Sequence, residues 1–134
     1  MASNTIDQAI SVYVKASTTV YDEIGTRFYY VEAERDASYP YSVYFVVSDP
    51  HEPFAFNSYN SGQARIQINT YDADRYNALE ISDKIRDRIH LSTAAALDGV
   101  TVHSVKCSGT IVDPLPEQDI FRARFDALVE YEDA

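Results

Sequence analysis

Asp72 and Asp74 are the acids whose spacing first raises the question of chemistry. They lie in the segment RIQINTYDADRYNALEISDKI, residues 65–85. Two carboxylates work as general acid and base only when they face one pocket and their environments push their pKa values apart. The next acid, Glu80, falls on the solvent-exposed face of the helical pattern that follows, so the sequence offers no second catalytic group nearby. An aspartate before a helix instead caps free backbone N–H groups, which typically contributes about 1 kcal/mol. We therefore interpret both aspartates as helix caps.

The other reactive side chains are also scattered. His51, His90 and His103 are not spaced with one another or with acids as a metal site requires. The sequence contains no glycine-rich phosphate loop, no Gly-x-Ser-x-Gly elbow and no Cys-x-x-Cys. Cys107 lies in a strand pattern and is interpreted as a small buried hydrophobe. The sequence thus predicts no catalytic residue, no metal and no cofactor. A small enzyme that uses Asp72 or His51 is an alternative without a second catalytic partner.

Length and composition indicate one ordinary globular domain, residues 1–134. Hydrophobic residues make up 46% and charged residues 24% of the chain. The longest apolar run, residues 44–47, is far too short to span a bilayer, and the first residues lack the layout of a signal peptide. A single cysteine cannot form an internal disulfide. We expect synthesis inside the cell and no membrane contact.

The net charge of −10, from 21 acids against 11 lysines and arginines, argues against wrapping around nucleic acid. It is compatible with a protein that lets nucleic acid pass without binding it. The chain also has 11 tyrosines, 6 phenylalanines and no tryptophan. Tyrosine favours strands and is also enriched at interfaces, so a tyrosine-rich sheet and an interface both remain open.

Hydrophobic spacing indicates the elements of the first half. Ile6, Ala9, Ile10 and Tyr13 predict an amphipathic helix over 4–16, capped by residue 4 or 5. A short strand is predicted within 27–33. Residues 41–48, YSVYFVVS, are apolar on both faces and predict a central strand covered on one side and partly on the other. The loop 49–62 carries three aromatic rings, which either bind a partner, tuck back onto the domain or extend a hairpin.

The second half changes period twice. Residues 64–69 alternate between apolar and polar types, which predicts a strand with one solvent-exposed face. From Arg75 the apolar residues follow a helical period, in a stripe of Ala78, Ile81, Ile85 and Ile89. Glu80 and Lys84 on this helix are spaced as an i,i+4 ion pair. Residues 91–99 continue this helix or add a turn. A strand over 100–112, a turn over 113–119 and a clearly alternating last strand over 121–130 follow. We predict an α+β fold: a single, mostly antiparallel sheet of about four to five strands packed against two main helices.

The order of these motifs resembles a known family. The first helix is followed by IGTRFYYVEA, YPYSVY, ARIQINTYDADRYNALEISDKI and FRARFDALVEY. This order resembles the tail terminator, or tail-completion, proteins that join head and tail in long-tailed bacteriophages, over roughly residues 5 to 132. The resemblance implies an α+β subunit of a homohexameric ring on the head-proximal end of the tail tube. Such a ring stops tube polymerisation, contacts the tail tube protein and the head connector or stopper protein, and lets DNA through.

A closed ring needs two different interaction surfaces on each subunit. We expect the loop 49–62 and the acidic end VEYEDA to differ most from relatives and to contact partners. The candidate interface residues are Phe54, Phe56, Tyr59, Glu130, Tyr131, Glu132 and Asp133. We further hypothesise that part of the acidic surplus faces the lumen, where it repels phosphates. A head-completion or stopper protein of the connector and a generic acidic interaction domain remain alternatives.

Overall fold

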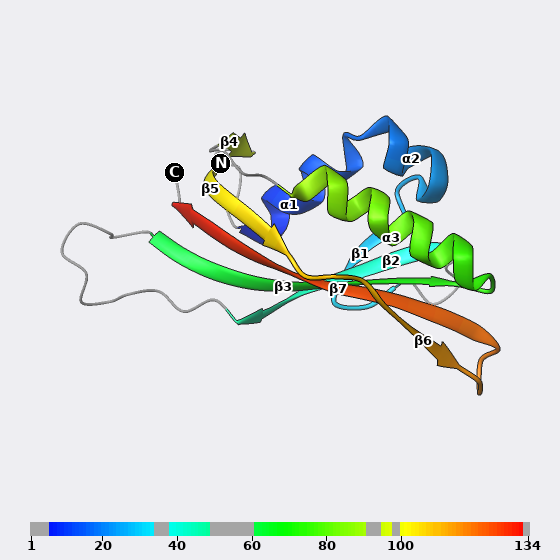
Figure 1. Cartoon of the computed structure of the whole chain (residues 1–134). Coiled ribbons are helices and arrows are strands. Elements are labelled where there is room, and N and C mark those ends of the chain that lie inside the picture. Colours follow the sequence, from blue (N-terminus) through cyan, green and yellow to red (C-terminus); the bar gives the residue numbers. More distant parts are fainter. Residues whose placement is uncertain (1–5, 34–37, 49–60, 91–94, 98–99, 133–134) are drawn as a thin grey trace.

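The computed structural model describes residues 6–33, 38–48, 61–90, 95–97 and 100–132. In this part of the chain, seven strands form one sheet and three helices lie on one of its faces (Figure 1). The predicted α+β fold with a single sheet is confirmed. The predicted numbers of four to five strands and two helices were too low.

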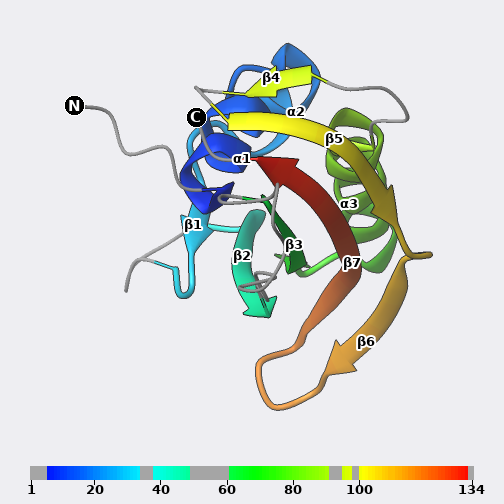
Figure 2. The same cartoon turned by 90° about the vertical axis from the view of Figure 1, so that its left-hand side faces the viewer.

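The sheet has the order β1 (Phe28–Tyr30), β2 (Tyr41–Ser48), β3 (Ser61–Asp72), β7 (Ile120–Glu132), β5 (Val100–Cys107) and β4 (Ala95–Leu97). The strand β6 (Ile111–Leu115) also pairs with β7, beyond the end of β5. The sheet is mixed, since β1 and β2 are parallel and the other pairs are antiparallel. The two long strands β3 and β7 pair along their whole length and form its spine. Figure 2 shows β5 and β7 curving past the helices, and the β6–β7 hairpin extending beyond them.

The first helix, α1 (Ile6–Lys15), confirms the predicted amphipathic segment, because Ile6, Ala9 and Ile10 are all buried. Tyr13 faces the third helix: the Arg88 guanidinium lies 3.8 Å above its ring and Arg88 Nε donates to its carbonyl oxygen at 3.0 Å. This contact fixes the first helix against the third.

The second helix, α2 (Thr18–Ile24), was not predicted. Its start is set by Ser17, whose Oγ accepts a hydrogen bond from the Val20 N–H at 3.4 Å. Its end is set by Gly25, whose φ of 60° is a left-handed value that favours glycine. A helix of seven residues is too short to show a clear hydrophobic period, so only these caps mark it.

The third helix, α3 (Arg75–Ile89), confirms the predicted stripe. Ala78, Ile81, Ile85 and Ile89 are each at most 1% exposed. They pack on the helix-facing side of the sheet, where alternate residues of the two spine strands are also buried: Ala64, Ile66, Ile68, Phe125, Ala127 and Val129. The alternation read from the sequence of β3 and β7 therefore sets which side of the sheet is core.

Two predicted boundaries in the second half were wrong. The helix does not continue through 91–99: it ends at Ile89, and β4 lies at Ala95–Leu97, where it pairs back onto β5. The predicted strand 100–112 is two strands, β5 and β6. They are separated at Ser108, whose Oγ accepts from the Asp126 N–H at 2.9 Å while its own N–H donates to the Asp126 carbonyl.

The predicted turn 113–119 is also shorter in the structure. Its first three residues belong to β6, and the chain turns over 116–119. Asp119 adopts a φ of 57°, a left-handed conformation that aspartate tolerates better than most residues. The strand β6 gives the first residues of β7, Ile120 to Arg124, a hydrogen-bonding partner, whereas β5 pairs only with the later residues of β7.

Candidate functional site: the uncovered face of the sheet

The side of the sheet that points away from the helices carries no second layer in the described part of the chain (Figure 1). Because side chains alternate along each strand and the strands are in register, this side shows rows of residues from β2, β3 and β7. We call it the uncovered face. Three of its rows are Tyr41–Tyr71–Arg122, Val43–Asn69–Arg124 and Phe45–Gln67–Asp126, and Arg65, Leu128 and Glu130 extend it.

The uncovered face is more apolar than a solvent-facing side of an antiparallel sheet normally is. The strand β2 places Tyr41, Val43 and Phe45 on it, and Val43 is only 6% exposed. Asn69, in the same row as Val43, is 5% exposed and accepts a hydrogen bond from the Gln67 side chain at 3.0 Å. This explains why the sequence of β2 is apolar on both faces: the helices bury one side, and the other contributes to a half-buried surface.

A tyrosine cluster occupies one end of the uncovered face. The Tyr41 ring stacks on Tyr39 at 5.4 Å between centroids, lies tilted 5.2 Å from Tyr71, and meets Tyr29 edge-on at 6.1 Å. Burial raises the pKa of Tyr41, and the three neighbouring tyrosines raise it further. Tyr39 itself is 46% exposed. Rings that are half buried and carry a hydroxyl group at their edge are typical of protein interfaces.

An arginine pair lies next to the tyrosine cluster on the same face, because Arg122 of β7 pairs with Tyr71 of β3. Asp113 of β6 accepts a hydrogen bond from Arg122 Nη2 at 3.0 Å and another from Arg124 Nε at 2.9 Å. These two bonds hold the pKa of the Asp113 carboxyl below its ordinary value. One carboxylate shared between two guanidinium groups leaves a positive charge, and the buried Nε of Arg122 has no hydrogen-bond partner in the described structure. The two guanidinium groups can therefore donate further hydrogen bonds to a carboxylate or carbonyl oxygen.

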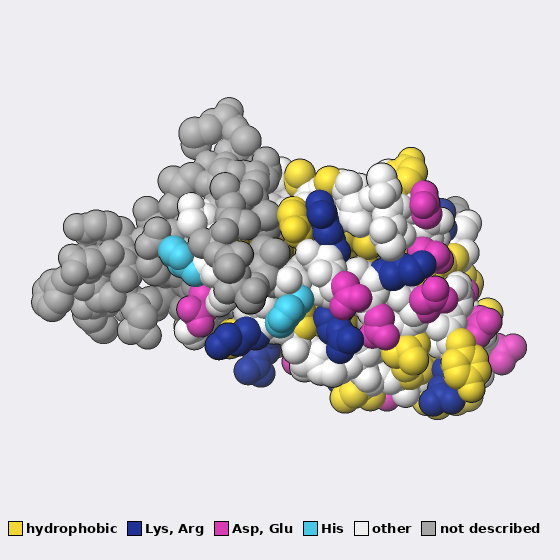
Figure 3. All heavy atoms as spheres, turned by 45° about the horizontal axis from the view of Figure 1, so that its top comes forward, with side chains coloured by type: hydrophobic (Ala, Val, Ile, Leu, Met, Phe, Trp, Pro, Cys, Tyr) yellow, Lys and Arg dark blue, Asp and Glu magenta, His cyan; other side chains and the backbone are white. Residues whose placement is uncertain are grey.

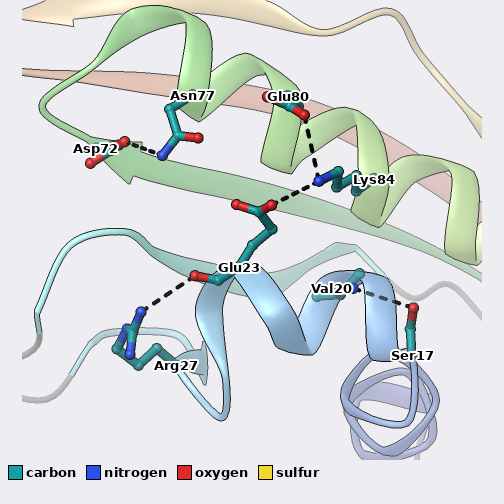
Figure 4. A network of polar contacts seen from close by, with 8 residues as sticks. All are labelled: Ser17, Val20, Glu23, Arg27, Asp72, Asn77, Glu80 and Lys84. Carbon is teal, nitrogen blue, oxygen red and sulfur yellow. Dashed lines mark hydrogen bonds and ion pairs between the residues drawn. The ribbon is translucent and has the colours of Figure 1, made fainter.

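The helix side of the molecule is different in character. Acidic and basic side chains alternate over α3, so no large area of one charge forms there (Figure 3). Lys84 joins α3 to α2, because its Nζ lies 2.8 Å from Glu23 Oε1 (Figure 4). The hydrogen bond to Glu23 is the main reason that the pKa of Lys84 is raised. The predicted pair with Glu80 is confirmed at 3.5 Å.

Asp72 and Asp74 occupy the joint between β3 and α3, where each has its own partners. Asp74 is the N-cap of α3, and its Oδ1 accepts from the backbone N–H groups of Tyr76 at 2.9 Å and Asn77 at 3.4 Å. Asp72 is 8% exposed and accepts from the Ala73 N–H and, at 2.6 Å, from the Asn77 side chain (Figure 4). Both carboxylates are engaged in holding the first turn of the helix.

A cleft of about 280 Å³ lies at the end of α3, lined by Arg86, Asp87, His90 and Cys107. Burial raises the pKa of the Cys107 thiol to about 11, so the thiol is protonated at neutral pH and is a poor nucleophile. Among the residues described, no three His, Cys, Asp or Glu side chains gather as a metal site would need. No described helix is long and apolar enough to cross a membrane.

The predicted interface residues have different positions. Phe54, Phe56, Tyr59 and Asp133 lie outside the described residues, as does His51, and of Glu132 only the backbone, at the end of β7, is described. Glu130 is half buried on the uncovered face. Tyr131 is 3% exposed within the core, because odd-numbered residues of β7 face the helices, so its side chain is not presented to a partner.

Sequence reasoning did not identify the tyrosine cluster or the arginine pair. Residues 29, 41 and 71 are far apart in the chain, and only the register of three strands brings them together. The available signal was the two-sided apolar pattern of residues 41–48 together with the alternating arginines of FRARF.

The fold is shared with chains of known structure. One is a chain of the virion of a native gene transfer agent particle, with a TM-score of 0.71 and 12% sequence identity over 97% of this chain and 99% of that one. Another, for which no function is named, has a TM-score of 0.57 and 10% identity over 97% of this chain and 98% of its own. No protein-family model matches the sequence, and no curated protein matches it either. At these identities the likeness shows a common fold.

Proposed function

We propose that this chain is a structural protein of a phage-like virion. The observation that carries the proposal is the likeness in fold, over nearly the whole of both chains, to a chain from the virion of a gene transfer agent particle. The sequence motifs point independently to the same class of protein, since their order resembles that of phage tail-completion proteins. Two separate lines of reasoning, one from motifs and one from the backbone, thus favour one class.

Within that class we propose the tail terminator role. Six copies of the chain form a ring at the head-proximal end of the tail tube. This ring stops tube polymerisation and joins the tail to the head connector. The resemblance of the sequence to terminator proteins supports this role. The uncovered face also supports it, because a ring subunit needs adhesive surfaces beyond its own core.

The charge of the chain supports a passage for DNA through such a ring. The net charge of −10 opposes binding to phosphates, and acids that face a lumen would keep DNA from sticking. Reversing the charge of lumen acids should therefore slow or trap DNA passage. Unchanged infectivity after most of those acids are removed would contradict this part of the proposal.

We propose no catalytic role. The carboxylates of Asp72 and Asp74 are engaged by the first turn of α3, and the Cys107 thiol has a raised pKa. These observations favour a structural protein over an enzyme that uses the same residues.

The proposal is tested by co-assembly. Purified protein is mixed with purified tail tubes and, separately, with portal rings, and the products are examined by native mass spectrometry and negative-stain imaging. A sixfold ring on tube ends supports the terminator role. Binding to portal rings alone would assign the chain to the stopper position instead, and binding to neither would contradict a place at the head–tail junction.

A further inference from the structure

We infer that the uncovered face is the surface by which one copy of this chain docks, head to tail, on the next copy. The inference deepens the proposed function and rests on the self-assembly proposed there. It names one of the two subunit surfaces that a ring requires, and it assigns a second copy of the chain as the occupant.

The first argument is the composition of the face. Of the residues that line it, tyrosine, phenylalanine and arginine are the types that protein interfaces favour most. Tyr39 at the edge of the face and Ile111 of β6, which pairs with Arg124, are 46% and 54% exposed. When a partner removes large apolar side chains on such a sheet surface from water, the free energy of the complex is lowered.

The second argument is charge. Four of the 11 lysines and arginines lie on this side of the sheet: Arg65, Lys106, Arg122 and Arg124. The acids described there are Asp113, Asp126 and Glu130. Among the side chains that the structure describes, this side is therefore close to neutral, whereas acids outnumber lysines and arginines on the rest of the described molecule.

This distribution selects both the occupant and the geometry. Two copies that each carry −10 repel one another, and they approach at least cost where cations are densest. If two uncovered faces met each other, the arginines of one copy would stand near those of the other. When the uncovered face meets the acidic remainder of a second copy, the arginines find carboxylates instead. That contact is heterologous, and a heterologous contact closes into a ring when its rotation permits.

The test uses two matched pairs of variants of the full chain. Arg65→Glu and Lys15→Glu both reverse one exposed charge, the first on the uncovered face and the second at the end of α1. Tyr39→Ser and Tyr21→Ser both remove one exposed ring, 46% and 53% exposed, the first at the tyrosine cluster and the second on α2. Circular dichroism and thermal unfolding verify that each variant is folded.

Self-association is measured by sedimentation velocity at rising protein concentration, at low and at high salt. We expect the wild type to associate, and salt to weaken the association. Arg65→Glu should raise the dissociation constant roughly tenfold or more, with Tyr39→Ser acting in the same direction, while both control variants match the wild type. A wild type that stays monomeric at the highest concentration, or equal effects of Arg65→Glu and Lys15→Glu, would overturn the inference.

The same variants separate this inference from the proposed function in a tube-capping assay. A wild type that caps tail tubes but never associates with itself keeps the function and removes the inference. Self-association through the uncovered face without binding to tubes or portals keeps the inference and removes the function. If Arg65→Glu self-associates normally but no longer binds tubes, the face belongs to the tube protein, and the assignment to a second copy is wrong.

Discussion

Asp72 and Asp74 stand two positions apart, yet they stabilise α3 through different groups. Asp74 accepts from backbone N–H groups that the helix itself cannot satisfy. Asp72, the last residue of β3, binds the side chain of Asn77 and so holds the first turn against the strand. One carboxylate caps the helix, and the other joins it to the sheet. Neither role requires a pocket, which is why this pair carries no sign of catalysis.

Replacing Asp74 with alanine should lower the free energy of unfolding by about 1 kcal/mol, because two N–H groups of the first turn lose their acceptor. Urea unfolding followed by circular dichroism measures the change. Asp74→Asn is the control, since asparagine caps helices about as well as aspartate and should retain most of the stability. Equal losses in the two variants would show that the charge, and not the hydrogen bonds, is what matters.

The acid side of the pH–stability curve should depend on Asp113. Its folded-state pKa is lowered from the ordinary value of 3.8, first by the hydrogen bond from Arg122 and then by that from Arg124. A lowered carboxyl pKa adds stability that is complete above the unfolded-state pKa and is lost as the pH falls through the folded-state value. The wild type should therefore be more stable than Asp113→Asn at neutral pH, and the difference should vanish in strong acid. Urea titrations from neutral to acid pH test this, and a difference that is independent of pH would contradict it.

Cys107 should react slowly in the folded protein. Burial raises its pKa from 9.0 to about 11, so at pH 8 the thiolate is about 100-fold less abundant than in a free thiol. Alkylation by iodoacetamide, followed by mass spectrometry, should be slower in the native chain than in urea by about that factor or more. Similar rates in both states would show that the thiol is open and ionised, and would reopen the cleft at the end of α3 as a reactive site.

At the scale of elements, long segments with one clear period were predictable, and so was the short β1, which lies within the predicted range 27–33. The α3 stripe and the alternation in β7 were read correctly, because each repeats over several turns or residue pairs. The short elements α2, β4 and β6 were missed. A cap at Ser17 and Gly25 defines the first, and hairpin pairing with the following strands β5 and β7 defines the other two. Strands of three and five residues are too short to show a clear alternation, so they leave little trace in the local sequence.

The candidate site was likewise predictable from the sequence only in part. The sequence of β2 already shows that both of its faces are apolar, which predicts some cover on each side. It does not show that Tyr29 and Tyr71 lie beside Tyr41, or that Asp113 lies between two arginines. Those contacts depend on the parallel pairing of β1 with β2 and on the switch of partner from β5 to β6 along β7. Sequence reasoning placed the candidates instead at the loop 49–62 and the C-terminal end.

The packing of α3 on the sheet should dominate the stability of the fold. Ile85 is fully buried between α3 and the spine strands, so Ile85→Ala should lower the free energy of unfolding by about 2 to 5 kcal/mol. Tyr76 lies in the same helix but is 73% exposed, and Tyr76→Ala should change it by less than about 0.5 kcal/mol. Denaturant unfolding of both variants gives the comparison. A small effect at Ile85 would mean that the helix layer is only loosely packed on the sheet.

At the scale of the whole molecule, the two sides of the sheet have different roles. The helix side contains the core and the ion pairs that fix the helices, such as Lys84 with Glu23. The uncovered face contains aromatic and basic side chains, of which Tyr39 and Arg65 are exposed. The arrangement suits a subunit whose stability is internal and whose adhesive surface is left free for assembly.

The distribution of charge leads to a last prediction, which concerns DNA. The chain has 21 acids and 11 bases, and the Lys and Arg side chains of the uncovered face are assigned here to a second copy of the protein. The purified protein should therefore not retard a DNA duplex in a gel, even at low salt, where phosphate neutralisation contributes most to affinity. Retardation by the wild type that Arg65→Glu abolishes and Lys15→Glu preserves would show that the uncovered face binds phosphates. Since a lumen must let DNA slide, such a result would contradict both a repelling passage and the assignment of this face to the next subunit.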